Sequence, residues 1–258
     1  MATVRGSMME AVISALEEEG GWPEFVELYQ PDKSIVLLSD AAKCQSVEAC
    51  LRFCNLPVTR KYCKNAEFMS PNGEVPLLRA GNALPGGIQE IFSYIQKKGM
   101  SVSELLLKPQ EKAEMMAYIS LVEKCFLPAE LYMSWCNKEW AIRSRHKYGS
   151  PYPTPLNIIL GYKKQMSVCN QLKAMNWHLK KEEEVIEEFK KGCQALAEKL
   201  GGRKYFIHDS PTELDAVVFG HLHTILMRYQ PDDSLESVVK MHKNLVDFVA
   251  RILKEYFR

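Results

Sequence analysis

Residues 210–222 spell Ser-Pro-Thr-Glu-Leu-Asp-Ala-Val-Val-Phe-Gly-His-Leu, a helix start that runs directly into an apolar face. Thr212 and Asp215 have the spacing of a capping box. The Thr212 hydroxyl can accept a hydrogen bond from the Asp215 backbone N–H, and the Asp215 carboxylate can accept one from the Thr212 N–H. The apolar residues that follow have helical spacing: Leu214, Val217, Val218 and Leu222. We therefore expect a capped, buried helix here, with Thr212 and Asp215 in structural roles.

The composition excludes several classes of protein. The chain has 258 residues, 47% of them hydrophobic, and a formal net charge of +1, so no long-range field attracts nucleic acid or an anionic membrane. The N-terminal segment is acidic, with Glu10 and Glu17 to Glu19, which argues against a secretory or transit peptide. The best apolar run, 214–227, contains Asp215, His221 and His223, and is too short and too polar to span a bilayer. We expect a soluble chain that does not bind nucleic acid.

The cysteines and histidines predict no metal site and no cofactor. None of the eight cysteines forms a C-x-x-C pair or lies at zinc-ligand spacing from histidines, so we expect free thiols in a reducing compartment. Cys50 and Cys54 suit neighbouring positions on one helix face, and Cys63, near a strand, is the one cysteine considered for redox chemistry. His221 and His223 lie two residues apart, so on a helix they face different directions and cannot ligate one metal ion.

The first hundred residues mix strand and helix signals. Strands are expected at 25–29, 58–63 and 75–79, and 35–38 is a further apolar run. A helix begins at Ser39 and ends before Pro57, and another covers 88–95. This order resembles the thioredoxin-like half of a glutathione-transferase-type protein, over residues 23–99, with a four-stranded mixed sheet. In that resemblance Pro76 is structural, and the Val75–Pro76 peptide bond is expected to be cis.

The rest of the chain predicts helices only. These cover 112–135, broken at Pro128, a segment opened by Tyr152–Pro155, then 182–200, the capped helix, and 237–256. Residues 100–258 therefore resemble the all-helical C-terminal domain of glutathione transferases. Residues 1–22 are expected to form a helical N-terminal extension.

Three sequence segments resemble one particular family with this fold: residues 65–76 (NAEFMSPNGEVP), 148–157 (YGSPYPTPLN) and 211–222 (PTELDAVVFGHL). They resemble the metaxins, and the match extends from about residue 22 to residue 257. The resemblance implies a peripheral protein on the cytosolic face of the mitochondrial outer membrane. Its implied partners are another metaxin, in a heterodimer, and a β-barrel assembly component. Since the chain stops at Arg258 without the C-terminal anchor of one relative, it is expected to reach the membrane only through partners.

The sequence is compatible with two other functions. The first is an adaptor that couples mitochondria to transport machinery, with Miro or kinesin- and dynein-associated proteins as partners. The second is a glutathione-dependent transferase. Such an enzyme lowers the pKa of the glutathione thiol with a hydroxyl near the end of the first strand, and Tyr29 and Ser39 are hydroxyls in roughly that region. However, transferases hold the γ-glutamyl group with an acidic residue and Ser where this chain has Pro85-Gly86-Gly87. We therefore expect a degenerate glutathione site and no catalytic residues, although a helix N-terminus there could still attract an anion.

A basic cluster precedes a proline-rich loop in the second half. Such a loop is extended and costs little entropy to immobilise on binding. A rigid connection between helices, with its tyrosines packed inward, explains the loop equally well. A solvated turn likewise explains the basic cluster, so for both features the two alternatives stay open. The candidate partner-binding residues are Arg143, Arg145, Lys147, Tyr148, Pro151, Tyr152 and Pro153.

Overall fold

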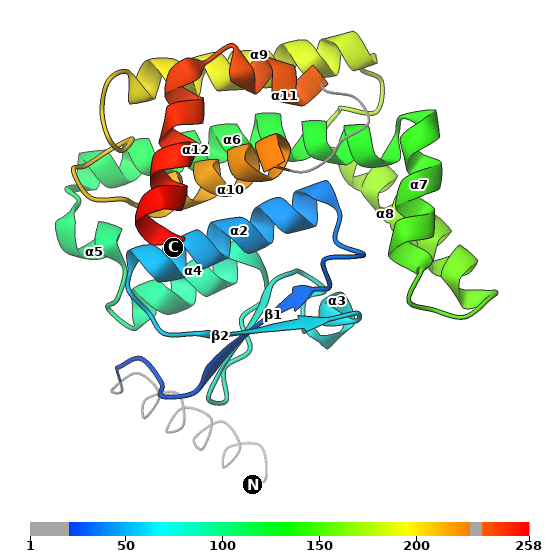
Figure 1. Ribbon diagram of the computed structural model, residues 1–258, viewed down its shortest axis with the longest axis horizontal. Coiled ribbons are helices and arrows are strands. Elements are labelled where there is room, and N and C mark those ends of the chain that lie inside the picture. Colours follow the sequence, from blue (N-terminus) through cyan, green and yellow to red (C-terminus); the bar gives the residue numbers. More distant parts are fainter. Residues whose placement is uncertain (1–20, 228–233, 258) are drawn as a thin grey trace, which may run out of the picture.

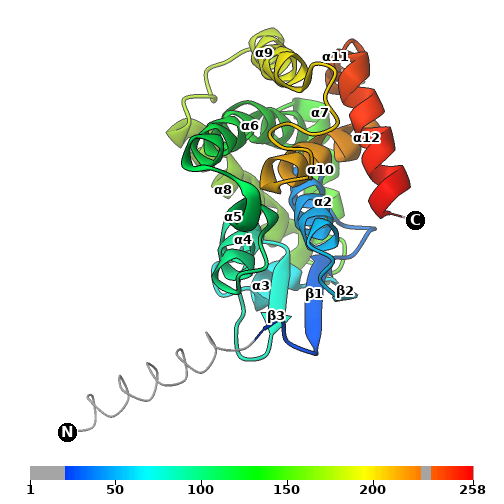
Figure 2. The same cartoon turned by 90° about the vertical axis from the view of Figure 1, so that its left-hand side faces the viewer.

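The computed structural model describes residues 21–227 and 234–257, so most of the expected N-terminal helical extension lies outside the described residues. A small sheet with its helices forms one end of the molecule, and long helices form the remainder (Figure 1). The view at right angles shows β1, β2 and β3 below α2 and α10, with α9 and α11 at the top and α12 on the right (Figure 2).

The sheet has three strands in the described residues: β1 (Val26–Pro31), β2 (Thr59–Cys63) and β3 (Leu77–Ala80), in the order β2-β1-β3. β1 pairs parallel with β2 and antiparallel with β3. The expected four-stranded sheet is therefore wrong. After the turn at Gly81 the chain makes only isolated bridges, at Ala83 and Gly86, and Pro85 between them has no N–H to donate.

Three helices accompany the sheet: α2 (Leu38–Phe53), α3 (Ala66–Met69) and α4 (Gly87–Lys97). The run 35–38 forms no strand and leads directly into α2. Ser39 does not cap α2, because the N-cap position is Leu37 and Ser39 is buried in the first turn. The Val75–Pro76 bond is cis, as predicted, and so is Thr154–Pro155, which was not predicted.

The remaining helices are α5 (Val102–Leu106), α6 (Pro109–Trp135), α7 (Lys138–Gly149), α8 (Leu156–Ala174), α9 (Glu182–Leu200), α10 (Glu213–Met227), α11 (Ser234–Lys240) and α12 (Lys243–Tyr256). The predicted bounds of α9 are confirmed. Contrary to prediction, α6 continues through Pro128, which is buried among core residues whose packing outweighs the lost hydrogen bond. The predicted helix 237–256 is two helices, because the chain breaks between α11 and α12 at Met241 and His242.

The capped helix α10 lies at the centre and packs against α2, α6, α11 and α12. The Thr212 N–H and hydroxyl both donate to Asp215 Oδ2 at 2.8 Å, and the Phe206 N–H donates to Oδ1 at 3.0 Å. The carboxylate thus fastens the preceding loop as well as the helix start. Asp215 is fully buried, and this burial raises its pKa from 3.8 to about 6.

α10 and α2 cross at Gly220. A Cβ atom at this position would lie 2.1 Å from Ser46 Oγ and 2.6 Å from the Ala42 carbonyl oxygen. Because α2 follows the first strand and α10 belongs to the helical half, this crossing gives both halves a common core. In the part of the chain that the structure describes, no helix combines the length and apolarity needed to cross a bilayer.

Candidate functional site

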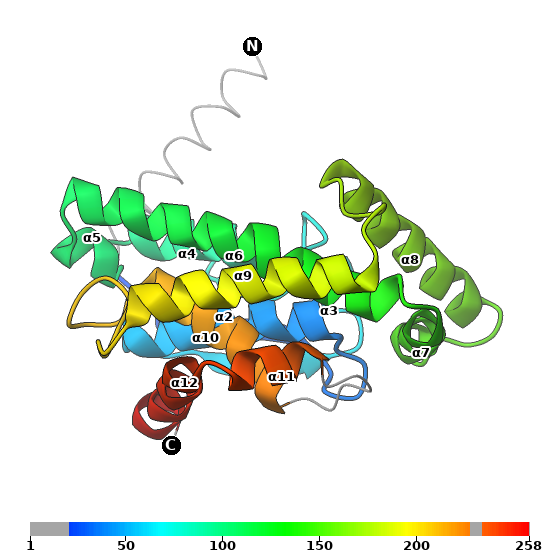
Figure 3. The same cartoon turned by 90° about the horizontal axis from the view of Figure 1, so that it is seen from above.

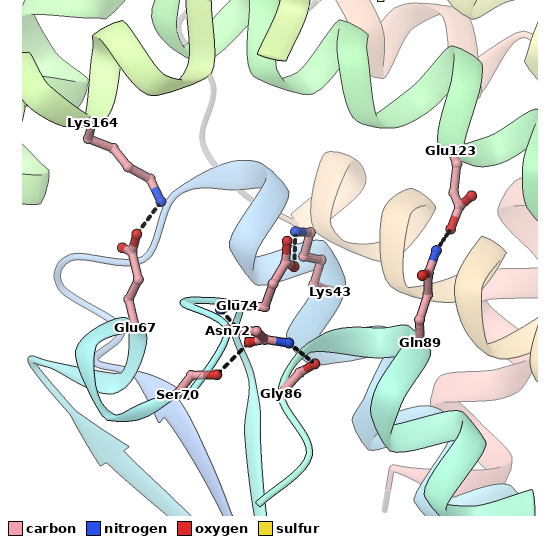
Figure 4. Close-up of polar contacts among 9 residues, drawn as sticks. All are labelled: Lys43, Glu67, Ser70, Asn72, Glu74, Gly86, Gln89, Glu123 and Lys164. Atoms are coloured by element: carbon pink, nitrogen blue, oxygen red, sulfur yellow. Dashed lines mark hydrogen bonds and ion pairs between the residues drawn. The ribbon is translucent and has the colours of Figure 1, made fainter. Parts of the chain in front are cut away.

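A cleft of about 400 Å³ lies between the start of α4 and the helical half, where the sequence predicts a degenerate glutathione site. α2 contributes Lys43, and the segment before β3 contributes Asn72 and Glu74. The opposite wall comes from α6, α8 and α10, through residues that include Glu123, Gln171 and His221. Figure 4 shows several of these polar side chains turned toward one another.

The N-terminus of α4 is occupied by groups of the protein itself. The Gly86 N–H donates to Glu90 Oε2 at 2.9 Å, and the Gly87 N–H donates to the Pro76 carbonyl at 2.8 Å. Asn72 donates its side-chain N–H to the Gly86 carbonyl at 2.9 Å. Two of the N–H groups at this helix start, those of Gly86 and Gly87, therefore already have partners, and one of these partners is a carboxylate.

Glu74 places a second carboxylate beside the start of α4. A Cβ at Gly87, whose φ is +76°, would lie 3.0 Å from Glu74 Cβ and 3.2 Å from its Oε2. Lys43 Nζ, the cation of the cleft wall, is 2.6 Å from Glu74 Oε2. The cleft thus brings the carboxylates of Glu74 and Glu90 to the start of α4, where Gly86-Gly87 stand in place of the acidic residue and serine of a transferase.

Tyr29 and Ser39, the hydroxyls considered for thiol activation, do not line the cleft. Tyr29 donates to Glu27 Oε2 at 2.9 Å, and this hydrogen bond raises the pKa of Tyr29. Cys63, the residue considered for redox chemistry, lies at the end of β2, where burial raises the pKa of its thiol and so disfavours the reactive thiolate.

A buried contact between a histidine and a carboxyl group beneath the cleft could not be foreseen from the sequence. His221 Nδ1 lies 2.7 Å from Glu130 Oε1, and both side chains are almost completely buried. Burial raises the pKa of Glu130, and His221 opposes this shift. The two residues are 91 positions apart on different helices, so no local pattern connects them. His223 instead stacks on Phe219, which agrees with the prediction that the two histidines face different directions. Among the described residues, no three His, Cys, Asp or Glu side chains gather as a metal site would require.

The two tyrosines of the proline-rich segment face the sheet half. Tyr148, in α7, donates to Glu67 Oε2 at 3.0 Å, and burial raises the pKa of Tyr148. Lys164 of α8 donates to the other carboxylate oxygen of Glu67 at 2.7 Å, a contact visible in Figure 4. The ring of Tyr152 meets that of Phe68 edge-on, with centroids 6.3 Å apart. These contacts fasten α7 and α8 to α3.

The other candidate residues lie further out. Arg143 covers the Trp140 ring at 4.9 Å, and Arg145 covers the Tyr162 ring at 4.4 Å. Pro153 is exposed, whereas Pro151 and Lys147 are half-buried. The expected basic turn is mostly helix, because α7 extends to Gly149. The structure therefore separates the two tyrosines, which pack inward, from the three basic residues and two prolines, which are exposed or half-buried.

Comparisons with known proteins agree with the sequence resemblance. Residues 44–165 match a family described as "Outer mitochondrial membrane transport complex protein", and residues 189–252 match the glutathione S-transferase C-terminal domain. Metaxin-2 of Homo sapiens is 44% identical over 250 residues, which cover 96% of this chain and 95% of that protein. The chain belongs to the metaxin family. The metaxin-2 homolog of Caenorhabditis elegans is 34% identical over 79% of this metaxin and 89% of the worm protein.

Solved structures show that this metaxin has the glutathione-transferase fold. Glutathione transferase F7 of Populus trichocarpa superposes with a TM-score of 0.55 at 15% identity, covering 88% of this chain and 93% of that one. The beta-etherase LigF of Sphingobium gives a TM-score of 0.57 at 16% identity, covering 90% and 98%. At such low identity the likeness concerns the fold alone.

Proposed function

We propose that this metaxin is a non-enzymatic subunit of the machinery that sorts and assembles β-barrel proteins in the mitochondrial outer membrane. It would act on the cytosolic face, together with another metaxin and a β-barrel assembly component. The family and its outer-membrane transport role support the setting. The observation that supports the non-enzymatic part is the start of α4, where Gly86-Gly87 stand in place of the transferase clamp and the Gly86 N–H already donates to Glu90.

The proposed partner surface is in the helical half. It comprises the segment from Tyr148 to Pro153 with the neighbouring Arg143, Arg145 and Lys147. The contacts of Tyr148 and Tyr152 with α3 support this proposal, because they hold the loop in one conformation before any partner arrives. A preorganised surface loses less conformational entropy on binding than a mobile one.

Affinity purification of the tagged chain from solubilised mitochondria tests the proposed role. We expect another metaxin and a β-barrel assembly component in the eluate. Recovery of motor-associated proteins in their place would contradict the proposal and favour the adaptor function that the sequence also allows.

Glutathione should neither bind tightly nor be conjugated by this chain. The acid-and-serine clamp is missing at Gly86-Gly87, so the charge-assisted hydrogen bonds that orient glutathione cannot form. Titration calorimetry should show no binding at micromolar glutathione, with a catalytically active transferase as the positive control. Micromolar affinity, or a conjugation rate that depends on Tyr29 or Ser39, would refute the non-enzymatic proposal.

Membrane attachment should depend on protein partners. The almost neutral chain gives anionic lipid little overall attraction, so we expect high salt or alkaline carbonate to release it from mitochondria. Depleting its metaxin partner should lower its level in the mitochondrial fraction, and an integral outer-membrane protein that stays in the pellet is the control. Purified protein that bound bare liposomes as firmly as mitochondria would exclude attachment by partners.

A further inference from the structure

The outward side of α7 and α8 is an apolar helix surface that no other element of residues 21–227 and 234–257 covers. We call it the hairpin face and define it by Ile142, Ile158, Ile159, Tyr162 and Met166. These side chains are 61%, 54%, 58%, 54% and 67% exposed. Ile158, Tyr162 and Met166 follow one another at intervals of four residues and so form one stripe along α8. Figure 3 shows α7 and α8 at one end of the molecule, beyond the end of α9.

A hollow deepens the hairpin face. It has a volume of about 180 Å³, and Ile142, Ile158 and Tyr162 line it together with Arg145 and His146. Glycines bring the two helices close enough to form it: a Cβ at Gly149 would lie 2.3 Å from the Asn157 carbonyl oxygen, and one at Gly161 would lie 3.0 Å from that of Arg145. A small concave site between two helices suits an apolar side chain inserted from another helix.

The charge around this surface narrows the choice of occupant. Residues 138–174 contain seven Lys and Arg residues and one Glu, a formal charge of +6, whereas the whole chain carries +1. The remainder of the chain is therefore net acidic. Arg143, His146 and Lys163 are exposed beside the apolar stripe. A complementary occupant would combine an apolar stripe with carboxylates.

The N-terminal segment of this chain has that chemistry. In residues 1–20, outside the described part, Met9, Val12, Ile13 and Leu16 are spaced i, i+3, i+4 and i+7, which predicts one apolar helix stripe. Four carboxylates accompany the stripe, at Glu10, Glu17, Glu18 and Glu19. We propose that this segment of a second copy docks on the hairpin face, with its apolar stripe along α8 and its carboxylates toward the basic residues.

In its own chain the segment is attached at the end of the molecule opposite the hairpin face, since Figure 3 shows α5 and the α7–α8 pair at opposite ends. Gly21 lies at the far end of the molecule, where its Cβ position is 3.8 Å from Met100 Cε, between α4 and α5. From there α6 runs 27 residues, about 40 Å, before the chain reaches α7. The five residues from Leu16 to Gly21 span at most about 18 Å when fully extended. The docking therefore joins two molecules. Tyr148 and Tyr152 keep their contacts with Glu67 and Phe68 of α3 when it forms.

Sedimentation of the purified full-length chain over a range of concentrations tests the proposal. We expect reversible self-association, weakened at least about tenfold by Tyr162→Asp and equally by Ile13→Asp, because each substitution places a charge in the apolar contact. Leu179→Asp is the matched control, since Leu179 is 82% exposed and lies outside the hairpin face. Circular dichroism checks that each variant folds.

A charge exchange separates specific docking from general stickiness. Arg143→Glu and Glu17→Lys should each weaken association, and the double variant should recover it. A synthetic peptide of residues 1–20 should compete with association of the full chain. A chain that stays monomeric overturns the proposal. So does association that Tyr162→Asp abolishes but Ile13→Asp leaves unchanged, because the occupant is then not this segment. A monomer that binds phosphatidylserine vesicles through Tyr162 would assign the face to a bilayer and equally refute the proposal.

Discussion

Replacing Gly220 by alanine should destabilise this protein by about 3 kcal/mol or more, because overpacking a rigid contact typically costs 1–3 kcal/mol and here the obstacles include backbone atoms. The new Cβ would lie 2.6 Å from both the Ala42 carbonyl oxygen and the Ser46 backbone nitrogen. Helix propensity alone predicts the opposite sign, since alanine is favoured over glycine in a helix by about 1 kcal/mol. The larger packing term should therefore decide the outcome.

Thermal and urea unfolding measure this effect. A loss of 3 kcal/mol corresponds to a fall of roughly 6–12 °C in the midpoint for a chain of this size. Gly202→Ala is the matched control, because no atom lies within 4 Å of its Cβ position and no positive φ is recorded there. We expect that control to stay within about 0.5 kcal/mol of the wild type. Equal stability of the two variants would show that α2 and α10 separate readily at their crossing.

The sequence predicted those parts of the fold whose signals are local. α9 has the predicted bounds because an apolar stripe and a terminal Gly pair coincide there. α10 was predicted from its capping box and the apolar residues that follow. α7 was missed, because five of its twelve residues are charged and it is stabilised by contacts with α8 and α6 that no local pattern shows. Pro128 misled the prediction for the converse reason: the local rule favours a break, and core packing overrides it.

The candidate site was predictable only in part. Gly86-Gly87 showed that the transferase clamp is absent, and this could be seen from residue types alone. Glu90 accepts from the Gly86 N–H four residues earlier, which is a local contact, whereas the placement of Glu74 against Gly87 depends on how the turn before β3 meets α4. The Glu130–His221 pair and the bond from Tyr148 to Glu67 are likewise long-range. The sequence left the role of Tyr148 open because an inward and an outward tyrosine have the same local pattern.

Replacing Asp215 by alanine should cost about 2–4 kcal/mol, since the Thr212 N–H, the Thr212 hydroxyl and the Phe206 N–H would lose their buried acceptor. Thr212→Ala removes only the hydroxyl and should cost about 1 kcal/mol. Asp247→Ala, an exposed carboxylate in α12, is the matched control and should change little. Urea unfolding of the four proteins gives the comparison. An unchanged midpoint for Asp215→Ala would show that the box does not hold the central helix.

The pH dependence of the same site gives a second, independent test with Asp215→Asn. Burial raises the pKa of Asp215 from 3.8 to about 6, so the folded protein binds this proton more tightly than the unfolded chain. The resulting stabilisation is complete below the unfolded pKa and is lost as the pH rises through about 6. The wild type should therefore lose up to about 3 kcal/mol between about pH 4 and pH 7 relative to the Asn variant, in which residue 215 does not titrate. If the stability difference between the two proteins stayed constant over that range, the buried carboxylate could not be titrating there, and the environment inferred for Asp215 would be wrong.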